Sequence, residues 1–108
     1  MTVKEYLKKT IHKGKGIAYQ EIRPRVTCKD GYEISIQASR LHYCNPRENF
    51  LEEYESVELG YPNRYDELID EYAEDFDDDG KACTNTVFGF VPIEIVEKLI
   101  EKHGGIID

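Results

Sequence analysis

The segment from Arg23 to Glu48 constrains the fold most, because its side chains alternate between apolar and polar on both sides of one turn signal. Such alternation is typical of β-strands, and the dipeptide Asp30-Gly31 between the two runs indicates a turn. We therefore predict a β-hairpin with one apolar face. Its apolar positions are Val26 and Cys28 before the turn and Tyr32, Ile34, Ile36 and Ala38 after it.

The length of the hairpin loop decides which side chains share a face. A two-residue loop at Asp30-Gly31 sends the two apolar rows to opposite faces, because a slip of one residue turns every side chain over. A three-residue loop over residues 29–31 places Val26 opposite Ile34 and brings both rows onto one face. We therefore predict the longer loop, with Gly31 in the left-handed conformation that closes it.

The polar residues of the hairpin form its other face. In the predicted register Arg23 lies opposite Gln37, and Arg25 lies opposite Ser35. Two guanidinium groups beside an amide and a hydroxyl can hold a phosphate or a carboxylate. Because antiparallel sheets commonly leave one face in water, an ordinary solvated face is the alternative.

Apolar periodicity and capping residues predict helices at three places in the chain. Thr2 and Glu5 form a capping-box pattern at the start of a helix over residues 2–13. Asn63 is the expected N-cap of a second helix over residues 64–76. The third begins near Pro92 and stops at Gly104-Gly105, and His103 is expected to face the negative end of its dipole.

Further strands are expected at residues 53–59 and 84–91, and a brief strand at residues 17–21 is left open. The strand at 84–91 is apolar on both faces, which suggests a central strand, and Gly89 suggests a close backbone approach. The predicted order is αβββαβα: an α+β fold with a mostly antiparallel sheet of about four strands and helices packed on one face. We expect one domain over residues 1–108.

The charge of the chain is strongly divided along its length. The formal net charge is −8, with +6 on residues 1–47 and −14 on residues 48–108. An acidic half of this strength argues against direct binding of nucleic acid and favours a basic protein partner. No apolar run is long enough to span a membrane and no signal peptide is evident. The sparse cysteines fit reduced thiols, so we expect a cytoplasmic protein.

Nine carboxylates lie between residues 66 and 79 without an intervening basic residue. Like charges four residues apart weaken a helix, and anions near its C-terminus oppose the helix dipole. Solvation alone can account for such a run, but cations supplied by a partner would also offset the repulsion. We therefore expect this run to be the partner-binding surface, formed by Asp66, Glu67, Asp70, Glu71, Glu74, Asp75, Asp77, Asp78 and Asp79.

A second surface could bind a nucleotide signal through the hairpin and the polar loop after it. Its arginines would hold phosphate, Tyr43 would stack on a base, and Gln37 and His42 would hydrogen-bond its edges. A homo-oligomer would deepen the resulting pocket. The candidate ligand-binding residues are Arg23, Arg25, Gln37, Ser39, His42, Tyr43 and Arg47.

Catalytic and metal sites have weaker support in the sequence. Cys44 and His42 could serve as nucleophile and base, but no third group to orient them is identifiable. The spacing of Cys28, His42, Cys44 and Cys83 does not match paired zinc ligands. Residues 75–80 match the first half of a calcium loop, but Thr86 stands where the bidentate Glu is needed. We therefore predict no resident metal, no cofactor and no enzyme activity.

The sequence resembles a family of small, uncharacterised proteins encoded by phages and mobile elements of Firmicutes. The resemblance rests on four stretches: RPRVTCKDGY, QASRLHYCNPRE, ESVELGYP and TVFGFVPIEIVEKLIEKHGG. It implies an accessory protein of a phage, located in the cytoplasm of the bacterial host cell and similar in size and charge to anti-CRISPR and other counter-defence proteins. We therefore expect a stoichiometric inhibitor whose acidic surface imitates nucleic acid at a basic site on a host effector, with the nucleotide-binding role as the alternative.

Overall fold

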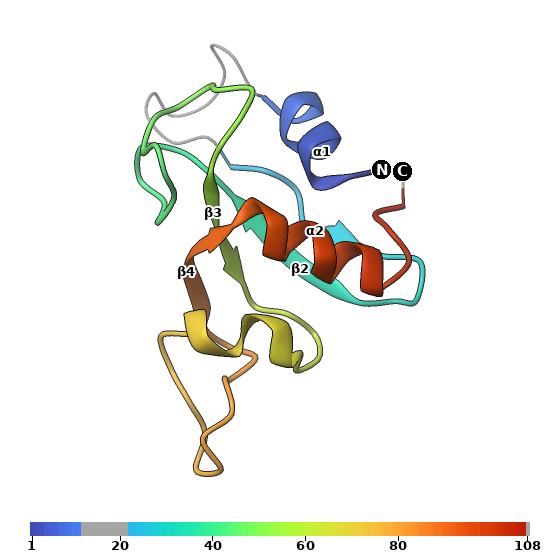
Figure 1. The fold of residues 1–108 in the computed structure, drawn as a ribbon, viewed down its shortest axis with the longest axis vertical. Coiled ribbons are helices and arrows are strands. Elements are labelled where there is room, and N and C mark those ends of the chain that lie inside the picture. Colours follow the sequence, from blue (N-terminus) through green and yellow to red (C-terminus); the bar gives the residue numbers. More distant parts are fainter. Residues whose placement is uncertain (12–21, 108) are drawn as a thin grey trace.

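The computed structural model describes residues 1–11 and 22–107, so the strand considered at residues 17–21 lies outside the described residues (Figure 1). A four-stranded antiparallel sheet has the order β1-β2-β3-β4. The predicted α+β fold and its order of elements are confirmed. Along the chain the elements are α1 (Val3–Lys9), β1 (Val26–Thr27), β2 (Glu33–Gln37), β3 (Ser56–Gly60), the 3-10 helix η1 (Glu67–Tyr72), β4 (Val87–Pro92) and α2 (Ile93–Lys102).

The hairpin of β1 and β2 has the predicted register. Val26 lies opposite Ile34, and the Cys28 N–H donates to the Tyr32 carbonyl across the three-residue loop at 2.8 Å. Gly31 closes that loop with a φ of 90°, in the left-handed region. The apolar row predicted for the hairpin is buried, so the hydrophobic pattern of the sequence predicted the correct loop length.

The first helix begins as the capping box predicts. The Glu5 N–H donates to Thr2 Oγ1 at 3.1 Å, and the Glu5 carboxylate accepts the Thr2 N–H at 3.0 Å. The helix ends at Lys9, earlier than predicted, with Thr10 as its C-cap. The Thr10 hydroxyl donates back to the Tyr6 carbonyl at 2.7 Å, a contact that competes with continued helix.

Helix α2 crosses in front of the sheet and contacts α1, β4 and η1 (Figure 1). Its buried positions are Ile93, Val96, Leu99 and Ile100. Gly104 and Gly105 both have positive φ, and the Gly105 N–H donates to the Ile100 carbonyl at 2.9 Å. These glycines end the helix as predicted, and Ile106 is buried behind them.

The helix predicted over residues 64–76 is present, but its predicted bounds are wrong. Only residues 67–72 form a helix, it is a 3-10 helix, and its N-cap is Asp66 rather than Asn63. Asn63 instead extends the hairpin, because its amide accepts the Glu33 N–H and donates to the Gly31 carbonyl, both at 2.9 Å. Beyond η1 the chain runs outward and returns through an isolated bridge between Phe76 and Ala82.

Strand β4 is the last strand of the sheet and not a central one, which corrects the prediction for residues 84–91. The pairing of β3 with β4 shifts register between Val57 and Leu59, so β4 contains a bulge at Gly89 and Phe90. A Cβ on Gly89 would lie 3.2 Å from the Tyr43 Cβ, which confirms the expected close approach there.

No helix in the two described ranges combines the length and apolar character needed to cross a membrane.

Candidate functional site

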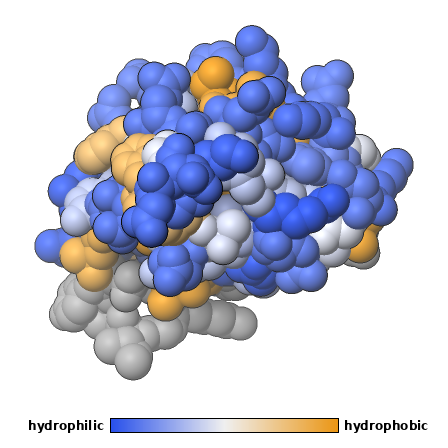
Figure 2. Space-filling view, turned by 90° about the horizontal axis from the view of Figure 1, so that it is seen from below, coloured by the Kyte–Doolittle hydropathy of each residue, from blue (hydrophilic) through white to orange (hydrophobic). Residues whose placement is uncertain are grey.

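Residues 67–85, which we call the acidic lobe, lie at one end of the molecule, and their tip projects beyond the sheet (Figure 1). Figure 2 views the molecule from this end, where the surface is mostly hydrophilic with small apolar areas. The molecule measures 43 × 26 × 22 Å, and the tip of the lobe lies along the longest of these axes. Lys81 is the single basic residue of this segment, and its Nζ lies 5.3 Å from the centre of the Tyr65 ring.

Part of the acidic run stabilises the lobe through hydrogen bonds to its own backbone. Asp77 Oδ1 accepts the N–H groups of Asp79 at 2.9 Å and Lys81 at 3.0 Å. Asp70 Oδ1 accepts the Ala82 N–H at 2.7 Å, which ties η1 to the returning segment of the lobe. These carboxylates hold the chain in a turn that a continuous α-helix would not allow.

Four other carboxylates of the lobe are exposed and make no side-chain hydrogen bond or ion pair with any described residue: Glu67, Glu74, Asp78 and Asp79. Glu71 is exposed as well, and its charge lies close enough to Tyr72 to help burial raise the pKa of that phenol. The ion pairs within the described ranges do not reach residues 67–79, so none of these pairs neutralises a carboxylate of that run.

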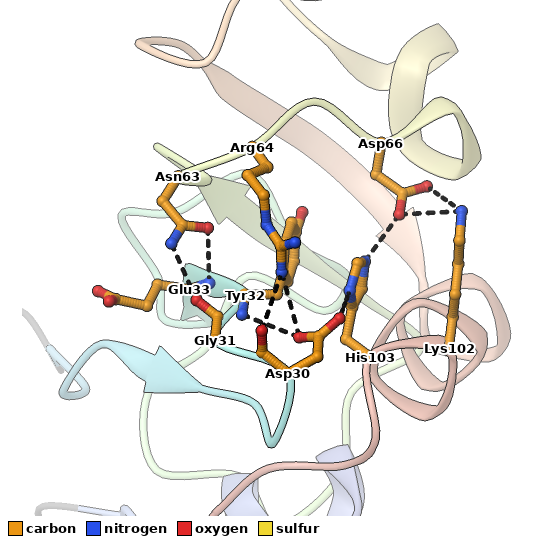
Figure 3. A network of polar contacts seen from close by, with 9 residues as sticks. All are labelled: Asp30, Gly31, Tyr32, Glu33, Asn63, Arg64, Asp66, Lys102 and His103. Atoms are coloured by element: carbon orange, nitrogen blue, oxygen red, sulfur yellow. Dashed lines mark hydrogen bonds and ion pairs between the residues drawn. The ribbon is translucent and has the colours of Figure 1, made fainter.

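Asp66 behaves differently from the other carboxylates, because it is buried at the start of η1 (Figure 3). Its carboxylate accepts the Leu68 N–H at 3.0 Å, His103 Nε2 at 2.8 Å and Lys102 Nζ at 3.1 Å. Burial raises the pKa of Asp66, but these three donors outweigh burial and leave the pKa below its usual value. Asp66 therefore fixes the base of the lobe to α2 and is not part of the exposed surface.

His103 joins the base of the lobe to the hairpin turn (Figure 3). Its Nδ1 lies 2.6 Å from Asp30 Oδ2, and its ring stacks on Tyr32 with centroids 3.9 Å apart. Both ring nitrogens lie within hydrogen-bond distance of a carboxylate oxygen, Nδ1 at Asp30 and Nε2 at Asp66. The hydrogen bond from His103 also lowers the pKa of Asp30, aided by the Tyr32 N–H. We call Asp30, Asp66 and His103 the clamp.

The hairpin face that was predicted to bind phosphate is closed to solvent at Arg23 and Gln37. Arg23 and Gln37 are buried, and the Arg23 N–H donates to Gln37 Oε1 while Gln37 Nε2 donates to the Arg23 carbonyl, both at 2.8 Å. The Arg23 guanidinium donates to the Ala38 carbonyl at 2.7 Å and to Thr10 Oγ1 at 3.0 Å. Arg23 therefore joins the end of α1 to the hairpin, and Gln37 pairs with the Arg23 backbone, so neither side chain is exposed for a ligand in this structure.

The other ligand-binding candidates lie in separate places. Arg25 is exposed and pairs with Glu33 at 3.1 Å. Ser39 and His42 are buried, with Ser39 Oγ 2.7 Å from His42 Nδ1. Tyr43 and Arg47 are exposed and adjacent, because the guanidinium carbon lies 5.5 Å from the ring centroid. The structure thus brings together Tyr43 and Arg47 but does not assemble the predicted nucleotide site.

Two of the three thiols, those of Cys28 and Cys44, are buried. Cys44 is buried, its Sγ donates to the Ser39 carbonyl at 3.1 Å, and burial raises the pKa of the thiol. Burial also raises the pKa of Cys28 to about 11. Neither thiol is exposed to an incoming substrate as a catalytic thiolate must be. Across residues 1–11 and 22–107, no three side chains of His, Cys, Asp or Glu are grouped closely enough to hold a metal ion.

Sequence reasoning missed the clamp and the contact between Tyr43 and Phe90. The clamp joins residues 30, 66 and 103, whose separations carry no local signal. The second contact had a partial signal, since Gly89 indicated a close approach without showing which segment approaches.

Comparison with known proteins gives no relative to carry a function across: no protein-family model matches this chain, and neither does any curated protein or solved structure.

Proposed function

We propose that the protein is a stoichiometric inhibitor that presents its acidic lobe to a basic, nucleic-acid-binding site on a host effector protein. The observation that supports this proposal is the group of exposed, uncompensated carboxylates on the lobe, Glu67, Glu74, Asp78 and Asp79. The resemblance of the sequence to phage-encoded accessory proteins fits a role in counter-defence.

The construction of the lobe suits binding more than solubility. Solubility needs only that carboxylates be exposed, whereas here Asp70 and Asp77 also hold the backbone that carries the exposed ones. A surface that is ordered before binding loses less conformational entropy when it docks. Its like charges repel one another in the free protein, and cations of a partner would remove that repulsion.

The chemistry of the partner follows from the sign and density of the charge. Several carboxylates in a short segment offer a cationic groove what a phosphate backbone offers, and complementary potentials accelerate association. Binding should therefore weaken as salt is added, and nucleic acid should compete for the same groove. A small-molecule role is less well supported, because Arg23 and Gln37 are internal.

The experiment compares two variants that remove equal charge from different places. The lobe variant neutralises exposed, unpaired carboxylates, while the control variant neutralises exposed carboxylates elsewhere on the chain. The lobe variant carries Glu67→Gln, Glu74→Gln, Asp78→Asn and Asp79→Asn; the control variant carries Glu48→Gln, Glu52→Gln, Glu53→Gln and Glu101→Gln.

Immobilised wild type, lobe variant and control variant are incubated with a bacterial lysate, and retained proteins are identified by mass spectrometry. We expect a basic protein that is retained by wild type and control, lost from the lobe variant, and displaced by duplex DNA or RNA. Equal retention by all three baits would contradict the proposal, because binding would then not depend on the lobe carboxylates. Equal loss from both variants would also contradict it, because total charge rather than the lobe would then explain binding.

A further inference from the structure

Phe90 combines a strained backbone with an exposed side chain. Its φ is 52°, in the left-handed region that bulky residues rarely adopt, and its side chain is 50% exposed. Glycine adopts this region most readily, because it has no Cβ. A half-exposed ring gains too little from burial to explain why phenylalanine stands there. Strain of this type is concentrated at functional positions, which makes Phe90 a candidate for binding.

The loop between β2 and β3 contacts Phe90 through Tyr43. The Phe90 N–H donates to the Tyr43 carbonyl at 2.9 Å, and the Tyr43 N–H donates to Glu58 Oε1 at 3.1 Å. The rings of Tyr43 and Phe90 have centroids 5.9 Å apart, and Arg47 lies over the Tyr43 ring. Tyr43 is itself 40% exposed. Tyrosine, arginine and large apolar side chains of this kind dominate binding energy at protein interfaces.

The pair formed by Tyr43 and Phe90 lies next to the acidic lobe along β4. The Glu74 N–H donates to the Val87 carbonyl, and Ala73 forms a bridge with Phe88. Val87 and Phe90 are three positions apart in the strand, so roughly 10 Å at most separates them at the usual rise per residue. One partner surface can therefore contact both features.

We propose that Tyr43 and Phe90 form the apolar anchor of the interface whose acidic part is the lobe, and that they insert into an apolar pocket within a cationic protein surface. This inference rests on the proposed function and names the second feature that the partner must have. The net charge of −8 disfavours a second copy of the chain or a nucleic acid as the occupant. Arg47 beside Tyr43 adds a donor for the rim of that pocket.

The test uses two peptides of equal charge, one of six arginines and one with a tryptophan inserted between its third and fourth arginines. Affinities for the whole protein are measured by calorimetry at low salt. We expect the tryptophan to strengthen binding to wild type by about 3- to 10-fold, since aromatic contacts contribute on this scale. Phe90→Gly and Phe90→Asn should lose this gain and keep their affinity for hexa-arginine.

Thermal unfolding separates a binding role from a structural one. Glycine and asparagine both tolerate positive φ, so Phe90→Gly and Phe90→Asn should melt at or above the wild-type temperature while losing the tryptophan preference. Ile107→Ser is the matched control, because Ile107 is exposed beside β1 at the other edge of the sheet. It should keep the preference.

The outcomes distinguish this inference from the proposed function. Equal affinity of wild type for the two peptides overturns the inference alone, and so does a preference that survives both changes at Phe90. If the lobe variant and the control variant weaken the binding of hexa-arginine equally, the proposed function is overturned, and this inference with it.

Discussion

The imidazole of His103 stacks on the phenol ring of Tyr32, with centroids 3.9 Å apart and planes 7° apart. This contact joins the end of α2 to the start of β2. It also holds the imidazole in line with Asp30 on one side and Asp66 on the other. The base of the acidic lobe is therefore fixed to the centre of the fold by a stacked ring that contacts both carboxylates.

Replacement of His103 by phenylalanine tests the clamp separately from the stacking. The variant His103→Phe keeps a flat ring against Tyr32 but leaves Asp66 buried with Lys102 as its remaining cationic partner. Hydrogen bonds to charged groups are strong, so we expect the free energy of unfolding to fall by about 2 kcal/mol or more. Urea unfolding measures the change, and a variant as stable as wild type would show that the clamp contributes nothing.

Replacement of Tyr32 by phenylalanine should have the opposite effect. The Tyr32 hydroxyl is buried and has no hydrogen-bond partner among the described residues. An unpaired buried hydroxyl opposes folding, so Tyr32→Phe should raise the free energy of unfolding by about 1 kcal/mol while the stacking on His103 is kept. A loss of stability in urea unfolding would mean that the hydroxyl is hydrogen-bonded in solution.

The clamp also predicts how stability depends on pH. The pKa values of Asp30 and Asp66 are lowered from the ordinary 3.8, by the His103 hydrogen bond at Asp30 and, against burial, by the Leu68 N–H, His103 and Lys102 at Asp66. Carboxyls with lowered pKa values stabilise the fold above their unfolded pKa, and this contribution is lost as pH falls through the folded pKa.

Urea midpoints measured from pH 6 to pH 3 check this dependence. The advantage of wild type over Asp66→Asn should be constant near neutral pH and shrink below about pH 4. Asp78→Asn serves as the control, because it removes an exposed carboxyl without an internal partner and should follow the wild-type curve. An advantage that grows as pH falls would contradict the sign of these shifts.

Local patterns predicted the parts of the fold whose determinants lie close together in the sequence. The register of the hairpin followed from its apolar rows, and the start of α1 and the end of α2 followed from Thr2, Glu5 and the glycine pair. In each case the deciding contacts span only a few residues, where propensity and capping rules apply.

The acidic lobe was not predictable in the same way. Its apolar spacing suggested a helix, but Asp70 bonds an amide twelve positions later and Asp77 bonds the backbone of its own turn. These contacts compete with helical hydrogen bonds, and helical like-charge repulsion favours them further. The backbone conformation of Phe90 could not be predicted from the sequence either, because its bulge depends on pairing with β3 and on the Tyr43 carbonyl.

Thiol reactivity tests the conclusion that Cys44 is not a nucleophile. Cys28 and Cys44 are buried with raised pKa values, whereas Cys83 is partly exposed. With a thiol reagent such as DTNB at pH 7.5, we expect one thiol to react quickly in the folded protein and the other two only after denaturation. Cys83→Ser should remove the fast phase. Fast labelling of Cys44 would restore the case for thiol chemistry.

The salt dependence of partner binding tests the central claim most directly. Affinities of wild type, the lobe variant and the control variant for the captured effector are measured by calorimetry between 50 and 500 mM salt. We predict that log K falls steeply with log salt for wild type and control, and that the lobe variant binds more weakly with a shallower slope. Equal affinities and slopes for all three proteins would contradict the claim that the acidic lobe is the docking surface.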